Sequence, residues 1–287
     1  MELIERSGYL DTLHQQLKQT ARGERFIFFL IGEAGIGKTS LVKAFVWEVV
    51  DDCNIYTGTC DSLFTPRPLA PLFDIAYQIG GQLPALLQST TDKSTLFAAF
   101  LQQLTSGSSP VVLVFEDIHW ADEATLDFIK FLSRRIGRSK CLFILTLRDN
   151  EISENHALRN VLADLSPDVM QKITLPPLSR QAVKEMAAVK GYSGEDVYNI
   201  SGGIPFYVNE ILASYSPGIP RNIKDAVLAI YQRTVGLKKE LWDLFAVAPH
   251  GIEMDLLEKI TPHYSHCLDE CISNGYFLTD KNTIRYK

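Results

Sequence analysis

The sequence predicts an α/β fold with a mainly parallel sheet, followed by helical segments. Up to about residue 175, short apolar runs rich in branched residues alternate with amphipathic segments, which is the pattern of parallel strands joined by helices. After Pro176 and Pro177 the strand signals stop, and helical patterns continue to about Tyr215. The strands are expected near residues 26–31, 54–59, 111–115, 141–147 and 171–175.

Two short segments that contain several prolines predict the domain boundaries. The length of 287 residues suggests about two domains, but the chain is interrupted twice, by the proline pair at 176–177 and by SPGIP at 216–220. We therefore expect three domains, at residues 1–175, 176–217 and 218–287.

The bulk composition excludes several classes of protein. With 46% apolar and 22% charged residues, the chain has an ordinary globular composition. Its net charge of −6 gives no overall positive field for nucleic acid or anionic lipid, so we expect no DNA contact by this segment. The longest apolar runs, FIFFLI, VVLVF and CLFILTL, fall short of the ~20 residues that span a bilayer, so no membrane association is expected.

The chain's beginning and its cysteines indicate a cytoplasmic location. Met1 is followed by Glu2 and an amphipathic stretch, whereas a secretory signal has a basic region and an apolar block. The five cysteines form an odd, unpatterned set, which is typical of reduced thiols in a cytosolic protein.

A glycine-rich segment, GEAGIGKTS, directly follows the first expected strand and precedes an expected helix. Gly32, Gly37, Lys38 and Thr39 fit the pattern G-x-x-x-x-G-K-[ST], in which glycines let backbone N–H groups converge on phosphate oxygens. Lys38 is expected to hold the terminal phosphates and the Thr39 hydroxyl to ligate Mg²⁺, with the helix dipole directed at the anion. The segment therefore predicts nucleotide binding. The expected phosphate-binding residues are Gly32, Glu33, Ala34, Gly35, Ile36, Gly37, Lys38, Thr39 and Ser40.

Two carboxylates, Glu116 and Asp117, follow the buried run VVLVF. Ligands of open parallel sheets bind at the carboxyl ends of the strands, and hard oxygen donors suit Mg²⁺. One carboxylate is expected to hold the metal while its neighbour orients or deprotonates an attacking water. We assign the metal to Glu116 and the water to Asp117, with the reverse assignment left open. His119 and Trp120 are expected to pack the loop that follows.

Arginines at two places are candidates for sensing phosphate. Arg148 ends the next strand, where its guanidinium would lie beside the γ-phosphate, and a plain surface charge is the alternative. Arg134 and Arg135 could act as an arginine finger in an assembly. However, two basic residues at a helix end more often interact with the helix dipole, and we prefer that interpretation.

The segment around Asp122 predicts an amphipathic helix that packs on the sheet. Asp122 can cap its beginning. Leu126, Ile129, Leu132 and Ile136 then recur at helical spacing.

A second cluster, His263, His266, Cys267 and Cys271 in HYSHCLDEC, could bind zinc from one helical face. However, C-x₃-C within a helix lacks the paired C-x₂-C turns of zinc sites. Both cysteines instead fit an apolar stripe of a small core, a role that free cysteine fills well.

Four segments together resemble the ATPase core of STAND signalling proteins, especially the AAA-type ATPases of large LuxR-type regulators. They are GEAGIGKTS at 32–40, VFEDIHWADEATL at 114–126, LTLRD at 145–149 and SGGIPFYVNEIL at 201–212. The resemblance covers essentially the whole chain and implies a P-loop NTPase sheet ordered 5-1-4-3-2, a small helical domain and a winged helix. It also implies that the GxP element, here Gly203, Ile204 and Pro205, packs its proline near the adenine.

The chain differs from the family pattern at two places. The amino-terminal element hhGRExE is present as LIERSGYLD, which retains Arg6 but lacks the glycine and the first acidic residue. Many relatives have two aspartates or Asp-Glu where this chain has Glu116 and Asp117, so a longer side chain occupies the metal-facing position.

The resemblance implies an ATP-dependent molecular switch with slow, regulatory hydrolysis. Its expected cofactors are ATP or ADP and Mg²⁺, and its expected partners are an inducer or partner protein acting through missing domains, with nucleotide-dependent self-association. The segment Ile284–Lys287 resembles the last strand of the winged helix, so the chain is expected to stop short of that domain's final motif; a complete small ATPase is the alternative. Other functions left open are an origin-recognition-type AAA+ DNA-processing ATPase, a small-molecule kinase and a nucleotide-binding scaffold without turnover.

Overall fold

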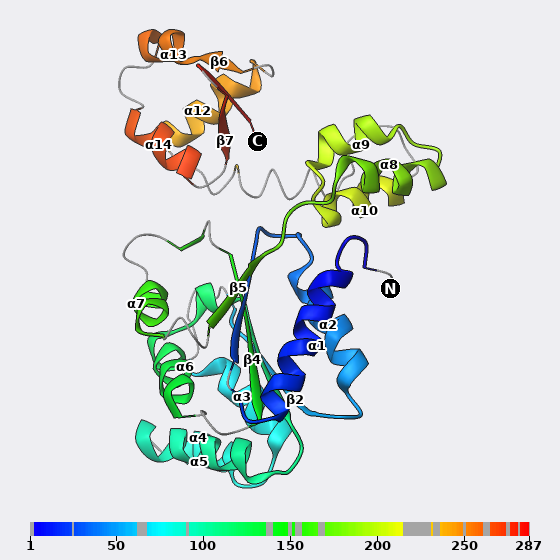
Figure 1. Ribbon diagram of the computed structural model, residues 1–287. Coiled ribbons are helices and arrows are strands. Elements are labelled where there is room, and N and C mark those ends of the chain that lie inside the picture. Colours follow the sequence, from blue (N-terminus) through cyan, green and yellow to red (C-terminus); the bar gives the residue numbers. More distant parts are fainter. Residues whose placement is uncertain are drawn as a thin grey trace. The chain divides into compact units, whose positions relative to one another are not determined.

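The computed structural model contains two compact units, Met1–Pro176 and Pro177–Lys287 (Figure 1). Among the described residues, no helix combines the length and the apolarity needed to cross a bilayer. The three-domain division remains a prediction, and its second boundary lies outside the described residues. The structure describes residues 3–24, 26–61, 68–89, 92–135, 140–148, 151–152, 157–165, 170–214, 231, 236–248, 251–260, 265–273, 276–280 and 282–286.

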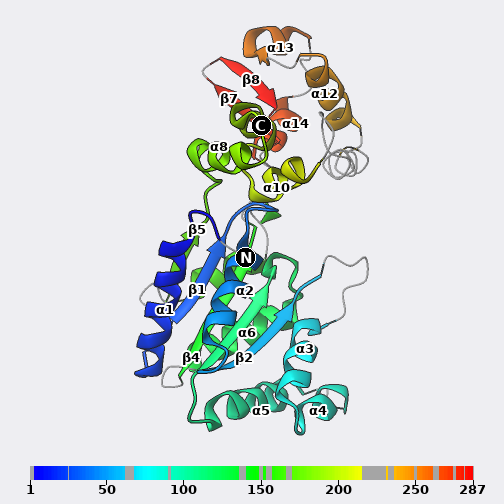
Figure 2. The same ribbon diagram turned by 90° about the vertical axis from the view of Figure 1, so that its right-hand side faces the viewer.

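The first unit is built on a five-stranded parallel sheet. Its strands are β1 (Phe26–Ile31), β2 (Asn54–Thr59), β3 (Val111–Glu116), β4 (Cys141–Leu147) and β5 (Met170–Thr174). The order across the sheet is β2-β3-β4-β1-β5, and every neighbouring pair is parallel (Figure 2). This is the predicted order 5-1-4-3-2, read from the other edge, so the predicted P-loop topology is confirmed. Central strands β1, β3 and β4 are buried on both faces, which explains why their sequences are continuous apolar runs.

Helices cover both faces of this sheet. Their bounds are Ser7–Ala21 for α1, Lys38–Val49 for α2, Ala70–Ile79 for α3, Leu83–Ser89 for α4, Lys93–Ser106 for α5, Glu123–Arg135 for α6 and Ala157–Asp164 for α7. Helices α1 and α2 lie on one face, and α6 and α7 lie on the other (Figures 1 and 2). Helix α3 packs beside β2, and α4 and α5 connect this layer to α6.

The beginning of α6 is fixed by Asp122, as the sequence predicts. The Asp122 carboxylate accepts hydrogen bonds from the backbone N–H groups of Ala124 and Thr125, at 3.0 and 3.1 Å. The apolar positions of the helix are buried as far as Leu132, while Ile136 lies outside the described residues.

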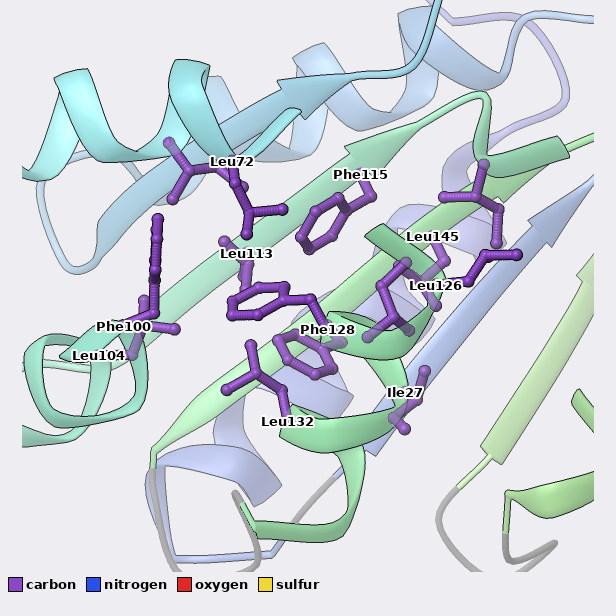
Figure 3. Close-up of a cluster of buried hydrophobic side chains, with 14 of the residues drawn as sticks. Ile27, Leu72, Phe100, Leu104, Leu113, Phe115, Leu126, Phe128, Leu132 and Leu145 are labelled. Atoms are coloured by element: carbon purple, nitrogen blue, oxygen red, sulfur yellow. The ribbon is translucent and has the colours of Figure 1, made fainter. Parts of the chain in front are cut away.

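Phenylalanine rings pack against one another in the core between the sheet and helices α3, α5 and α6. The buried Phe128 ring lies edge-on to those of Phe97 and Phe100, with centroids 5.1 and 5.2 Å apart. Such pairs contribute about 0.5–1.5 kcal/mol each beyond the burial of their area. Side chains of α3, α5 and α6 meet those of β1, β3 and β4 in this cluster (Figure 3). The core therefore fixes the strands whose carboxyl ends carry the candidate site.

The second unit begins with three helices, α8 (Arg180–Val189), α9 (Gly194–Ser201) and α10 (Pro205–Ala213). Serine caps begin the first two. The Ser179 hydroxyl accepts from the Ala182 amide at 3.1 Å, and the Ser193 hydroxyl accepts from the Asp196 amide at 3.4 Å.

The rest of the second unit combines helices with a small antiparallel sheet. Its elements are α12 (Leu237–Ala246), β6 (Ile252–Glu253), α13 (Met254–Ile260), α14 (Ser265–Ser273), β7 (Phe277–Asp280) and β8 (Thr283–Tyr286), with strand order β6-β8-β7. Cys271 is buried in their shared core and Cys267 packs against it, so both cysteines act as small apolar residues here. Of the histidines considered for zinc, His263 lies outside the described residues. The side chain of His266 is also outside them.

Candidate nucleotide-binding site

The loop between β1 and α2 depends on glycine. Gly32, Gly35 and Gly37 have φ angles of 155°, 76° and 99°, a region that residues with a Cβ rarely adopt. A Cβ on Gly32 would also lie 3.0 Å from Cγ2 of Ile36 and 3.4 Å from the carbonyl oxygen of Leu175. The loop therefore keeps its shape only with glycine at these positions, as the motif requires.

Neighbouring strands fix the loop where it leaves β1. The backbone N–H of Gly32 donates to the carbonyl oxygen of Leu147 at 3.3 Å, and the N–H of Leu175 donates to that of Ile31 at 2.9 Å. The loop is thus held between the ends of β4 and β5, beside the helix that begins at Lys38.

Lys38 lies inside the loop. Its side chain is buried, and Nζ donates to the carbonyl oxygens of Gly32 at 2.7 Å and Glu33 at 3.0 Å. A buried ammonium needs such partners because burial without them disfavours its charge. Its place at the loop suits contact with terminal phosphates, which the sequence predicts.

Thr39 and Glu116 bring the loop and β3 together. The Thr39 hydroxyl donates to Oε2 of Glu116 at 3.2 Å. Adjacent oxygen ligands of octahedral Mg²⁺ are about 2.9 Å apart when each metal–oxygen bond is 2.0–2.1 Å. A hydroxyl and a carboxylate at nearly this separation are a suitable donor pair for Mg²⁺, so the residues present fit that ion.

Asp117 has an unusual backbone conformation. Its φ and ψ of 54° and 47° are left-handed, which costs an L-residue roughly 1–2 kcal/mol. Its N–H donates to the Oγ1 atom of the fully buried Thr146 on β4, at 2.9 Å. This bond ties the turn after β3 to the neighbouring strand and fixes the backbone that carries the Asp117 side chain.

Arg148, at the end of β4, is held beside Asp117. Its Nη1 donates to Oε1 of Glu151 at 2.6 Å, and its Nε lies 3.9 Å from Oδ1 of Asp117. Its Cζ lies 4.7 Å from the centre of the Trp120 ring, within the range of a cation–π contact. The structure therefore brings the predicted residues together at the carboxyl ends of β1, β3 and β4. They are Lys38, Thr39, Glu116, Asp117 and Arg148.

Glu151 belongs to the same group of side chains, although the sequence does not predict it. Its Oε2 accepts from Nε1 of Trp120 at 3.0 Å and lies 3.3 Å from Nε2 of the buried His119. Burial alone would raise the pKa of Glu151, but hydrogen bonds from His119 and Arg148 and the arginine's charge lower that pKa to about 2. The only local signal is its position three residues after Arg148. His119 and Trp120, which the sequence predicts to pack the loop, also contact this carboxylate.

Arg134 and Arg135 lie in the last turn of α6, away from these groups. Nη1 of Arg135 donates to the carbonyl oxygen of Phe131 at 3.4 Å, and its Cζ lies 4.1 Å from the Phe131 ring centre. Nη2 of Arg134 lies 3.8 Å from Oδ2 of Asp164. The Arg135 contact agrees with the interpretation that this residue interacts with the helix end, whereas Arg134 pairs with a carboxylate of α7.

The GxP element begins α10, in the second unit. Gly203 has a φ of 76°, and a Cβ there would lie 2.4 Å from the carbonyl oxygen of Leu178, so only glycine fits. Ile204 occupies the N-cap position without a side-chain hydrogen bond to the helix. Pro205 occupies the first turn, where its missing N–H leaves no partner unsatisfied. The contact of Pro205 with adenine remains a prediction.

Fold and site together define a P-loop ATPase. The chain belongs to the AAA ATPase domain family, which it matches over residues 2–145. A comparison with curated proteins gave no match.

Two solved structures are similar to the chain over nearly its whole length. The Walker-type ATPase of Pyrococcus abyssi has a TM-score of 0.58 at 12% identity, covering 99% of this chain and 93% of that one. The Aeropyrum pernix ORC1 protein, solved in complex with DNA, has a TM-score of 0.55 at 12% identity, covering 99% and 90%. At this identity the likeness concerns the fold alone.

Proposed function

We propose that this chain binds ATP with Mg²⁺, hydrolyses it slowly and acts as the switch module of a larger signalling or transcription-regulating protein. The hydrogen bond between Thr39 and Glu116 is the observation that carries the proposal. It joins the phosphate loop to the strand that supplies the carboxylates, which is what a shared Mg²⁺–phosphate site requires.

Each site residue has a proposed role. Lys38 contacts the terminal phosphates, and Thr39 and Glu116 hold Mg²⁺, which neutralises developing charge on the phosphates when bound. Asp117 orients or deprotonates the attacking water. Arg148 contacts the γ-phosphate, since its Nε is buried without a hydrogen bond to any described residue and lies near Asp117.

The second unit is proposed to carry the switch. Helices α8–α10 form the helical domain with Pro205 near the adenine, and α12–β8, with their three-stranded antiparallel sheet, form a winged helix. Nucleotide state would set how these domains are oriented on the ATPase unit, and an inducer or partner protein would bias that equilibrium. Nucleotide-dependent self-association belongs to the same proposal.

Solution scattering of the ADP and ATP forms tests the switch. We expect different profiles for the two nucleotides, measured with Mg²⁺ in the Asp117→Asn variant so that ATP persists. Lys38→Ala is the matched control, and its profile should not respond to either nucleotide. Identical profiles for ADP and ATP, under conditions where calorimetry shows both bound, would refute the switch and leave a nucleotide-binding scaffold.

A DNA-processing ATPase is the second candidate. The similarity to the fold of ORC1, which was solved with DNA, favours it. The net charge of −6 opposes it, because most non-specific DNA affinity comes from neutralising phosphates. Fluorescence anisotropy with duplex DNA at two salt concentrations separates a DNA-processing ATPase from the switch module. Salt-sensitive binding would favour DNA processing, whereas no binding at low salt would exclude it.

A further inference from the structure

One carboxylate, that of Glu151, binds three side chains of the candidate site. Its Oε1 accepts from Nη1 of Arg148 at 2.6 Å. Its Oε2 accepts from Nε1 of Trp120 at 3.0 Å and lies 3.3 Å from Nε2 of His119. Trp120 and His119 follow β3, whereas Arg148 directly follows β4. Glu151 therefore joins the turns at the ends of two strands, one carrying the proposed catalytic carboxylate and the other the proposed γ-phosphate sensor.

Partial burial and the neighbouring side chains hold Glu151 and Arg148 in one arrangement. The His119 side chain is 0% exposed and that of Glu151 is 34% exposed, so both groups are removed from most of the solvent. The Cζ atom of Arg148 also lies over the Trp120 ring, 4.7 Å from its centre. While Nη1 is held by Glu151 and Cζ lies over the ring, the Nε of Arg148 lies 3.9 Å from Oδ1 of Asp117.

We propose that Glu151 is a positioning residue that orients Arg148 toward the γ-phosphate and so helps the site to distinguish ATP from ADP. The inference rests on the proposed function of the same site. An arginine side chain loses rotamer freedom when it is fixed, and Glu151 and Trp120 fix it before nucleotide arrives. ATP, which alone presents a γ-phosphate, gains from this preorganisation. ADP gains little.

The direction in which ATP affinity changes when the Glu151 carboxylate is removed separates positioning from the other roles that Glu151 could have. A carboxylate that only repels phosphate, or that only competes with it for Arg148, would weaken ATP binding, so its removal would strengthen it. A positioning carboxylate strengthens ATP binding, so its removal would weaken it. Glu151→Gln should therefore lower ATP affinity, roughly tenfold if most of the arginine's rotamer freedom returns, and change ADP affinity less than about twofold.

A similar trio in the second unit gives a matched control. Arg180 pairs with Glu195, and its Cζ lies 4.2 Å from the centre of the Tyr198 ring. Glu195→Gln removes the same charge from the same kind of arginine–aromatic contact. This variant should leave the affinities for both nucleotides unchanged.

The experiment measures ATP and ADP affinity by calorimetry in Mg²⁺ buffer for the full chain and for Glu151→Gln, Glu151→Asp and Glu195→Gln. A second readout is Trp120 fluorescence in a background carrying Trp47→Phe and Trp242→Phe. ATP should change this emission more than ADP does, and Glu151→Gln should abolish the difference. Partial rescue of ATP affinity by Glu151→Asp would support positioning through the carboxylate.

The possible outcomes also distinguish this inference from the proposed function. Stronger or unchanged ATP binding by Glu151→Gln, or equal losses for ATP and ADP, would overturn the positioning role. If Arg148→Ala weakens ATP selectively while Glu151→Gln does not, only the positioning role fails. If the unmodified chain binds no ATP, the proposed function fails and the positioning role fails with it.

Discussion

The hydroxyl of Thr39 donates a hydrogen bond to the carboxylate of Glu116 across 3.2 Å, although the two residues are 77 positions apart in the chain. The contact exists because β1 and β3 are parallel strands on either side of β4. The loop after β1 and the carboxylate at the end of β3 therefore meet at the carboxyl ends of the strands. The proposed Mg²⁺ site can therefore be tested by replacing the Glu116 carboxylate with an amide of the same shape.

Glu116→Gln should weaken the dependence of ATP binding on Mg²⁺. An amide keeps the shape and can still accept the Thr39 hydrogen bond, but it loses the negative charge that suits a divalent cation. Calorimetric titrations of ATP with and without Mg²⁺ measure the difference between the two conditions. A variant that keeps the Mg²⁺ dependence of the parent chain would contradict the metal assignment.

Lys38→Ala should remove most ATP affinity, by about tenfold to a hundredfold, since the backbone loop remains but the cation beside it is lost. Calorimetry with ATP in Mg²⁺ buffer measures this loss. Circular dichroism serves as the control for folding, because Lys38 also donates to two loop carbonyl groups. Binding as tight as in the parent chain would show that the phosphate site lies elsewhere.

Asp117→Asn should preserve ATP binding while lowering the turnover rate by about 10²–10⁴-fold, because an amide cannot take a proton from water. Phosphate release under saturating ATP measures the turnover. If Asp117→Asn and Glu116→Gln show exchanged phenotypes, the two carboxylates have exchanged roles. If both variants turn over at the parental rate, another base performs the step.

Much of the ATPase unit could be predicted because its signals are local. Buried strands such as FIFFLI and CLFILTL are continuous apolar runs, and they begin and end where the sequence predicts. The glycines at 32 and 37 mark backbone positions that few other residues can occupy. Edge strand β5 is partly exposed, so its pattern is weaker, and it begins one residue earlier than expected.

The role of Glu151 could not be predicted, because it depends on contacts between separate segments. In the sequence, Glu151 is one of 34 acidic residues and has no apolar pattern around it that would indicate burial. Only the packing of His119 and Trp120 against the end of β4 gives its carboxylate three partners. The left-handed conformation of Asp117 was likewise not evident from the sequence, because aspartate adopts it in only a minority of cases.

Arg148→Ala should reduce the preference for ATP over ADP, because only ATP presents a γ-phosphate to the end of β4. We expect a loss of ATP affinity of about tenfold or more, with a smaller change for ADP. Competition titrations with both nucleotides measure this ratio. Arg148→Lys is the matched variant: it keeps the charge but loses the planar fork, so it should restore the preference only partly. Equal losses for both nucleotides would exclude the sensor role.

The acid stability of the ATPase unit should depend on Glu151. Its pKa is lowered from 4.5 to about 2 in the folded chain, so its contribution is complete above the unfolded value and is lost as pH falls toward 2. The full shift corresponds to about 3 kcal/mol, and partial exposure of the carboxylate reduces the expectation to about 1–2 kcal/mol. Glu151→Gln should therefore unfold more easily in urea than the parent chain at pH 7, with the difference shrinking between pH 4.5 and pH 2. A difference that stays constant over this interval would mean that the loss comes from packing and not from the charge of the carboxylate.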